Sequence, residues 1–224
     1  MITGHNNRAL NPITLAFRDQ ANESAFILDH ATRSLIIVRV SLLFAAVLYI
    51  VYSLMDHWLV PDLAPGLLVL RAGGTAFLAG IAAFSVLPMA RMHFQLTMSL
   101  VVLIAGMGVI AIVVVVEHAG WYNYYGGVIL ATIYAHALLR LRFIWASMTS
   151  WTIIGAYLLA VTVLFPLPAQ VITSNMFHLV SANLLGMFAS YGLEYYARTV
   201  FLQTRMLVQS QHSLSMEYER TMAE

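Results

Sequence analysis

Cysteine and lysine are both absent from this sequence of 224 residues, and charged residues of either sign are scarce. The absence of cysteine excludes disulfides, thiolate metal sites and cysteine nucleophiles. All eleven basic residues are arginines, and they form no patch for phosphates, so we expect no nucleic-acid partner. No serine–histidine or paired-carboxylate pattern indicates a catalytic site, so no catalytic residue is predicted.

Apolar residues make up most of the sequence. Hydrophobic residues make up 61% of the chain and charged residues 9%, whereas a soluble domain is usually about a quarter charged. A soluble core of this size would still need a polar coat, so the composition predicts that lipid is the outer solvent. Residues 1–33 are polar and lack the apolar core of a secretory leader, so we expect a cytoplasmic N-terminal tail there.

Six apolar stretches indicate membrane-spanning helices. They are Leu35–Leu54, Gly66–Leu87, Phe94–Val116, Tyr124–Leu139, Phe143–Phe165 and Val171–Val200. Most reach the roughly 20 residues that a helix needs to cross the hydrocarbon. The fourth is the shortest, but it carries no formal charge between Gly126 and Leu139. The predicted fold class is therefore all-α: a polytopic membrane protein with a six-transmembrane-helix bundle and a C-terminal signalling helix.

The connections between these stretches sort by charge. Alternate connections and the C-terminal end hold Arg91, Arg140, Arg142, Arg198 and Arg205, whereas the others hold Asp56, Asp62 and Glu117 or no charge. Trp58, Trp121 and Tyr122 gather at the acidic side, where amphipathic rings favour the membrane boundary. Because basic connections stay in the cytoplasm, both termini are predicted to lie inside.

The last predicted helix continues beyond the membrane without a proline or glycine to end it. Val200, Leu207 and Leu214 recur every seven residues, as in a coiled-coil seam, although a solvated amphipathic tail explains the pattern equally well. We therefore expect three parts: the tail 1–33, the six-helix domain 34–200, and a cytoplasmic coupling helix 201–224. The pattern stops at Glu224 without a capping signal, so we expect that the natural protein is longer than this sequence.

Several ionisable residues fall near the outer ends of the predicted spans, where each one is a site hypothesis. His57, Arg71, Glu117, His118 and His178 are the candidates for a ligand or metal site. Neutral imidazole and carboxylate are common ligands of divalent metals, although adjacent pairs do not have helical metal spacing. The simpler interpretation is a structural cluster in which Arg71 pairs with Glu117 or Asp56.

Nearer the middle of the membrane, His136 and Asn183 fall at comparable depth on two predicted spans. An interhelical hydrogen bond is the favoured interpretation. Haem held by His136 and His178 is the alternative, because imidazoles from two helices are familiar axial ligands. Their axial offset of about 9 Å argues against haem. Any cofactor is therefore unidentified, with haem or a divalent metal at these histidines as the hypotheses.

Arg39 and Glu194 fall within the last turns of the membrane on the cytoplasmic side. They could pair, or Arg39 could extend to the headgroups. Together with Arg198, Leu207 and Leu214 they are the candidates for signal coupling. A small transporter, with His136, His178, Arg71 and Glu194 along its path, is a further alternative, although no inverted repeat or broken helix pair supports it.

Two stretches carry a family resemblance. The first runs from Tyr124-Tyr125-Gly126-Gly127 through Tyr134 to Leu138-Leu139-Arg140-Leu141-Arg142-Phe143. The second contains Asn175, Phe177, Leu179, Ala182-Asn183, Gly186-Met187, Ala189, Tyr191, Glu194, Arg198 and Phe201. Together they resemble the N-terminal six-helix membrane domains of bacterial membrane-bound nucleotide cyclases, which precede class III adenylate cyclase or diguanylate cyclase (GGDEF) domains. The first half of the chain matches only in its general hydropathy.

The resemblance implies a sensory or regulatory input domain in the bacterial inner membrane. Such a domain forms a homodimer among membrane lipids and drives a cytoplasmic cyclase domain through the helix that leaves the sixth span. Residues 202–224 are too few for a catalytic domain, so the chain by itself is expected to be inactive. The resemblance does not specify the stimulus, or whether the output is cyclic AMP or cyclic di-GMP.

Overall fold

The computed structural model describes residues 10–86, 93–121 and 124–223, and the regular structure within these ranges is helical. An isolated antiparallel bridge joins Leu10 and Phe17, and no strand is found in these ranges. The all-α class is thus confirmed. Leu87, Arg91 and Tyr122, which contributed to the predicted spans and connections, lie outside the described residues.

The described ranges contain eight helical segments. They are α2 (Gln20–Leu59), α3 (Ala64–Phe84), α5 (Phe94–His118), α6 (Gly126–Ile133), the π-helical turn η1 (Tyr134–Leu138), α7 (Phe143–Leu159), the π-helical turn η2 (Ala160–Leu164) and α8 (Ala169–Ala223). Proline separates several of them, because its ring removes a backbone donor and fixes φ. Pro61 follows α2, Pro65 lies in the first turn of α3, and Pro166 and Pro168 precede α8.

Among the residues that the structure describes, five helical stretches are long and apolar enough to cross a membrane: α2, α3, α5, α7 with η2, and α8. The fourth predicted span differs. Its helices α6 and η1 contain eight and five residues, so together they are about 20 Å long, against roughly 30 Å of hydrocarbon. The prediction of a helical protein with several candidate membrane spans is confirmed, and the count of six stays a prediction.

Large apolar side chains on the outer faces of the helices support the membrane assignment. Phe188 and Leu185 on α8 are 82% and 73% exposed, and Ile36 and Val40 on α2 are exposed as well. Soluble monomers rarely expose contiguous apolar surface on this scale. These faces are therefore suited to contact with lipid.

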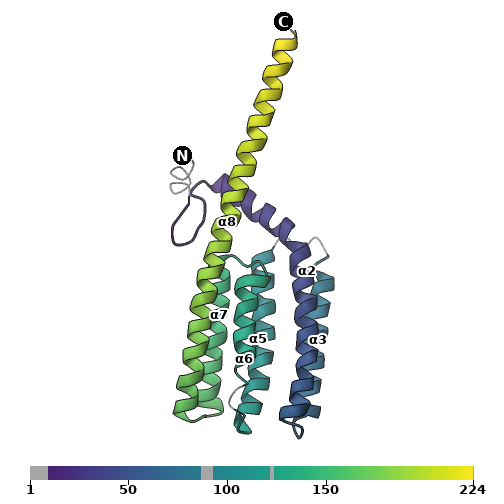
Figure 1. Cartoon of the computed structure of the whole chain (residues 1–224), viewed down its shortest axis with the longest axis vertical. Coiled ribbons are helices and arrows are strands. Elements are labelled where there is room, and N and C mark those ends of the chain that lie inside the picture. Colours follow the sequence, from purple (N-terminus) through teal and green to yellow (C-terminus); the bar gives the residue numbers. More distant parts are fainter. Residues whose placement is uncertain (1–9, 87–92, 122–123, 224) are drawn as a thin grey trace. The chain divides into compact units, whose positions relative to one another are not determined.

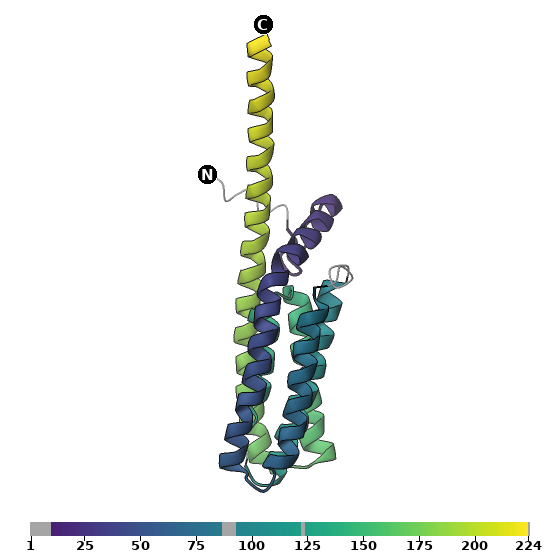
Figure 2. The same cartoon turned by 90° about the vertical axis from the view of Figure 1, so that its right-hand side faces the viewer.

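The chain divides into two compact units, of which one is Leu28–Ser190 and the other combines Met1–Ile27 with Tyr191–Glu224. We call them the bundle unit and the terminal unit. Helices α2 and α8 each run through a boundary between the two (Figures 1 and 2). These boundaries differ from the predicted 1–33, 34–200 and 201–224, because hydropathy marks where a segment turns polar, whereas contacts mark which segments pack together.

Helix α5 is central in the bundle unit. It packs against α3, α6 and α7 (Figures 1 and 2). Small residues allow the close approach of α5 to α7: a Cβ atom at Gly106 would lie 2.8 Å from Ile153 Cδ1. This use of glycine in helix contacts is typical of membrane bundles. The core around it is almost entirely aliphatic, so the few polar side chains inside it are conspicuous.

Candidate functional site

The first polar cluster of the bundle unit joins Asp56, Arg71 and Tyr124. Arg71 on α3 donates from Nε and Nη2 to the two carboxylate oxygens of Asp56 near the end of α2, the second bond measuring 2.9 Å. The Tyr124 hydroxyl donates to the same carboxylate. The rings of Tyr49 and Tyr52 lie 5.7 and 5.2 Å from the guanidinium carbon. Of the two predicted partners of Arg71, the structure selects Asp56.

Glu117 belongs to a second buried cluster. Its carboxylate accepts hydrogen bonds from the Tyr157 hydroxyl at 2.9 Å and from the Asn175 side chain at 3.0 Å. Asn175 also donates to the Tyr157 oxygen, at 2.8 Å. This triangle joins α5, α7 and α8. Sequence reasoning named Glu117 but missed Tyr157 and Asn175, although an asparagine within an apolar run is itself a signal of interhelical bonding.

The histidines proposed as metal ligands take no part in the hydrogen bonds described for these two clusters. His57, His118 and His178 are exposed. His178 Nδ1 lies 2.8 Å from the Ser174 carbonyl oxygen, and its ring contacts Tyr125. Within the described part of the chain, no group of three or more histidine or acidic side chains is arranged to hold a metal ion. The metal hypothesis stays a prediction that this geometry does not favour.

His136 lies in the π-helical turn η1 and bonds to two residues of α8. Its Nε2 lies 2.9 Å from Asn183 Oδ1, and its Nδ1 lies 3.0 Å from Ser190 Oγ. The predicted hydrogen bond between His136 and Asn183 is confirmed. Gly186 makes room for the ring, because a Cβ atom there would lie 2.6 Å from His136 Cδ2. Both ring nitrogens are engaged, so the haem hypothesis gains no support from this site.

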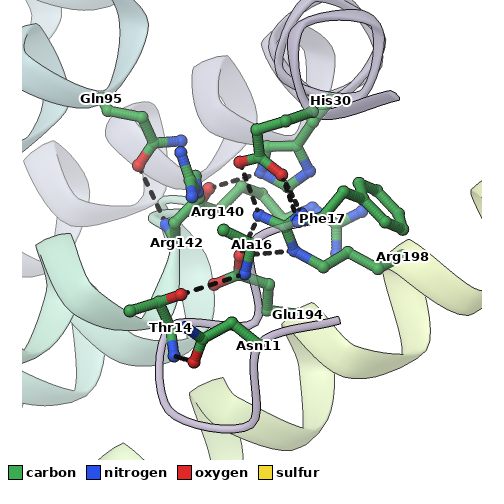
Figure 3. Close-up of polar contacts among 11 residues, drawn as sticks. Asn11, Thr14, Ala16, Phe17, His30, Gln95, Arg140, Arg142, Glu194 and Arg198 are labelled. Atoms are coloured by element: carbon green, nitrogen blue, oxygen red, sulfur yellow. Dashed lines mark hydrogen bonds and ion pairs between the residues drawn. The ribbon is translucent and has the colours of Figure 1, made fainter. Parts of the chain in front are cut away.

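Polar contacts also tie together the opposite end of the bundle unit. Arg39 donates to Ser85 Oγ at 3.1 Å and to the Ser85 carbonyl at 2.9 Å, a partner that neither sequence interpretation of Arg39 named. Figure 3 shows two further contacts of this unit: His30 Nε2 lies 2.9 Å from the Arg140 carbonyl oxygen, and the Arg142 amide donates to Gln95. Arg140 has a φ of 54°, the left-handed region that side chains rarely adopt.

In the terminal unit, Arg198 is fully buried between two carboxylates. Its Nε donates to Glu194 at 2.8 Å, and its Nη1 and Nη2 donate to Glu23 at 2.6 and 3.2 Å. The guanidinium carbon lies 4.2 Å from the centre of the Phe26 ring and 5.1 Å from that of Phe17. Figure 3 shows Arg198 beside Glu194 and Phe17. An arginine without such partners would be too costly to bury.

The N-terminal segment is folded so that it can supply these partners. Asn11 Oδ1 accepts the amides of Ile13 and Thr14 at 2.9 and 3.2 Å, and this turn is visible in Figure 3. The turn brings Leu10 and Phe17 together, and the Phe17 amide donates to Glu23 at 2.8 Å.

A small apolar cluster surrounds this ion pair. It contains Leu10, Phe17 and Phe26, with Ala197, Phe201 and Leu202 of α8 packed against them. The Tyr191 hydroxyl adds a hydrogen bond of 2.9 Å to the Pro12 carbonyl. Sequence reasoning named Arg198 and Glu194 but not Glu23 or the two phenylalanines. The two phenylalanines could have been noticed in the sequence, because they are large aromatic residues in an otherwise polar tail.

Leu207 and Leu214, the remaining coupling candidates, lie beyond this cluster on α8. They are 64% and 62% exposed. Helix α8 continues around them without a break to Ala223. Two leucines seven residues apart on an exposed helix form a short apolar stripe.

A cavity of about 110 Å³ lies inside the bundle unit. It is lined by α2 (Leu42, Ala45, Leu48, Tyr49, Tyr52), α3 (Arg71, Leu78), α5 (Val101, Val102, Ala105, Val109, Ile112, Val113), and the segment from Tyr124 to Leu139 (Tyr124, Gly127, Leu130, Ala131, Tyr134, Leu139). If it were empty, a cavity of this size would cost about 2 to 3 kcal/mol, at about 24 cal/mol per Å³.

The contact between His136 and Gly186 generates a prediction about stability. We expect Gly186→Ala to lower the free energy of unfolding by about 1 to 3 kcal/mol, because the new methyl group displaces a ring held by two hydrogen bonds. Gly155→Ala is the matched control, since nothing in the described structure lies within 4 Å of a Cβ atom there. Thermal unfolding in detergent measures both, and equal midpoints would contradict the assigned role of Gly186.

The buried ion pair generates a second prediction. Replacing Arg198 with Gln removes the cation that half-buried Glu23 and buried Glu194 share, and breaking a buried pair costs about 3 to 5 kcal/mol. We expect the N-terminal segment to detach, so that a single reporter cysteine at Leu10 reacts with a maleimide at least about tenfold faster. The natural chain has no cysteine, so the reporter is unambiguous.

Arg205→Gln is the control for this experiment. Arg205 also lies on α8 in the terminal unit, but it is exposed and bonds to Asn22. Exposed pairs contribute about 0 to 1 kcal/mol, so the labelling rate should hardly change. If both arginine variants changed the rate equally, or neither did, Arg198 would not hold the segment.

No protein-family model matches this sequence, and no curated protein matches it. The function is therefore inferred from the residues and their geometry.

Proposed function

We propose that this chain is the membrane-embedded input domain of a signalling protein and controls a cytoplasmic nucleotide cyclase domain that follows α8. The observation that carries the proposal is the continuity of α8. One helix contains an apolar stretch suited to the membrane, the buried Arg198 cluster and an exposed polar extension with Leu207 and Leu214. A continuous helix can transmit a small rotation or shift to an attached domain when its bundle has two packings that a ligand biases.

The proposal includes six membrane crossings in a bacterial inner membrane, with both termini in the cytoplasm. Five helices of sufficient length support most of this arrangement. The remaining crossing, Gly126–Leu138, is short, so it requires Tyr124 and Tyr125 to reach the interface beside it. The distribution of arginine over alternate connections supports the orientation.

The topology has a direct test in single cysteines introduced into this cysteine-free chain. We expect Trp58→Cys and Trp121→Cys to react with a membrane-impermeant maleimide on intact cells, because both positions are exposed and belong to the predicted outward loops. Gln209→Cys should react only after the cells are permeabilised. Labelling of Gln209→Cys from outside, or of Trp58→Cys only after permeabilisation, would contradict the orientation.

The proposal also includes a homodimer formed through the C-terminal part of α8. Leu207 and Leu214 are exposed in the single chain, and burying one leucine contributes about 1.5 to 3 kcal/mol. A second copy offers the same stripe at the same level of the helix. The heptad spacing of Val200, Leu207 and Leu214 suits a parallel pair.

The regulatory role is tested by joining residues 1–224 to an adenylate cyclase catalytic domain and measuring cyclic AMP in cells without their own cyclase. Replacing Leu207 and Leu214 with Asp should change the output by about tenfold or more, because two apolar contacts of the dimer are lost. Gln209→Asp with His212→Asp adds the same charges on the opposite face of the helix and should leave the output near its original value. Output indifferent to the leucine substitutions would contradict the proposed coupling.

Cross-linking tests the proposed dimer separately from the proposed regulatory role. Leu207→Cys and Leu214→Cys should form disulfide-linked dimers on mild oxidation of membranes, whereas Gln209→Cys should form few. If the two leucine-to-cysteine variants cross-link efficiently but replacing both leucines with Asp leaves the cyclase output unchanged, the dimer is supported and the regulatory role is excluded. Equal cross-linking at all three positions would exclude the proposed seam.

A further inference from the structure

The cavity of the bundle unit is long and narrow. Along α2 its lining residues run from Leu42 to Tyr52, a distance of about 15 Å at 1.5 Å per residue. On this helix Leu42, Ala45, Tyr49 and Tyr52 follow one another at intervals of three and four, with Leu48 beside Tyr49, so they share one face. The cavity volume is about 110 Å³, which is small for this length. A slender, unbranched occupant suits such a space better than a flat ring system.

The lining is hydrocarbon apart from tyrosine hydroxyls and Arg71. Arg71 is held by Asp56 and covered by the rings of Tyr49 and Tyr52, so its charge is already compensated. A cavity of this kind excludes water and favours an apolar occupant. No site for a polar headgroup is offered along its length.

Small residues give the cavity its width. Ala45, Ala105 and Ala131, from three parts of the lining, face this space. In membrane bundles small residues usually bring two helices together, as Gly106 does beside Ile153. Here the same residue type leaves room for something else.

We propose that this cavity is a binding site for one acyl chain of a membrane phospholipid. The cavity is partly open, and the candidate membrane-spanning helices place it among lipid chains. A phospholipid can insert its tail while its headgroup stays at the interface, where the headgroup remains hydrated. A free fatty acid would gain nothing for its carboxylate from the hydrocarbon lining. The inference goes beyond the regulatory role and does not depend on it.

The test uses the full chain in nanodiscs of phosphatidylethanolamine and phosphatidylglycerol that contain a small fraction of phosphatidylcholine with a diazirine in one acyl chain. After irradiation, mass spectrometry maps the labelled peptides. We expect labelling at the cavity lining of α2, α5 and the Gly127–Leu139 segment to exceed that of outward-facing positions severalfold. Ala105→Phe should reduce the cavity labelling by about tenfold, because the ring fills the space.

Ala111→Phe is the matched control, since it puts the same ring on an exposed face of α5 and should leave cavity labelling unchanged. Ala131→Phe repeats the block from another helix, with exposed Ala137→Phe as its control, in case Ala105→Phe does not fold. Uniform labelling that neither block reduces would overturn the proposal. Loss of cavity labelling on adding a low mole fraction of palmitic acid, with outward labelling retained, would also overturn it and identify a free fatty acid as the occupant.

Because this readout needs no output domain, its failure and the failure of the proposed regulatory role are distinguishable. If the cyclase fusion does not respond to the leucine substitutions, the photolabelling result is unaffected. If the cavity is not labelled, the result of the cyclase fusion is unaffected.

Discussion

Lipid offers no hydrogen-bond partners, so every polar side chain that an apolar helix carries inward must find its partner within the protein. In the described part of the bundle unit, three compact groups meet most of this requirement: Asp56 with Arg71 and Tyr124, Glu117 with Tyr157 and Asn175, and His136 with Asn183 and Ser190. Some buried polar atoms there, such as Ser99 Oγ, Ser150 Oγ and Asn183 Nδ2, have no hydrogen-bond partner. Each group joins residues that lie far apart in sequence. A helix that slid along its neighbour would leave a buried polar atom unpaired, so these groups fix the axial register of the bundle. Apolar packing alone fixes register far less strongly, because one aliphatic contact replaces another at small cost.

The same requirement explains which contacts could be predicted from sequence. Arg71 and His136 stand alone in apolar runs, so each needed a partner at its own depth, and Asp56 and Asn183 were both available there. The choice of Asp56 over Glu117 was open, because both acidic residues fall near the same end of their helices. Glu117 turned out to be held by neutral residues, Tyr157 and Asn175. A search for residues of opposite charge does not find neutral partners. For this reason it also missed Ser85, the partner of Arg39.

The terminal unit was harder to anticipate. A polar segment at the start of a chain has the composition of a solvated tail, and the turn at Asn11 leaves no periodic signal. The contacts that fold it involve residues whose sequence separation is very large, such as Glu23 and Arg198. The continuity of α8 beyond the apolar stretch, by contrast, followed from the absence of proline and glycine after Gly192. The proposed dimer and the proposed cyclase partner are properties of an assembly, and the sequence leads to them only through a family resemblance.

A buried ion pair adds little net stability, because desolvation offsets most of its attraction. It does, however, require its charged groups to keep one relative position. Arg198 is held at Nε, Nη1 and Nη2 at once, with an aromatic ring against the guanidinium. Sliding the N-terminal segment by one turn along α8 would separate Glu23 from Arg198, whereas the pair of Arg198 with Glu194 lies within α8 itself. The segment is therefore fixed at one position on the helix. For the signalling role proposed above such a contact would matter, because a rotation or shift reaches an attached domain only if the parts of the helix move together. The contacts of α8 with the N-terminal segment run from Tyr191 to Arg205, ahead of the exposed stripe of Leu207 and Leu214.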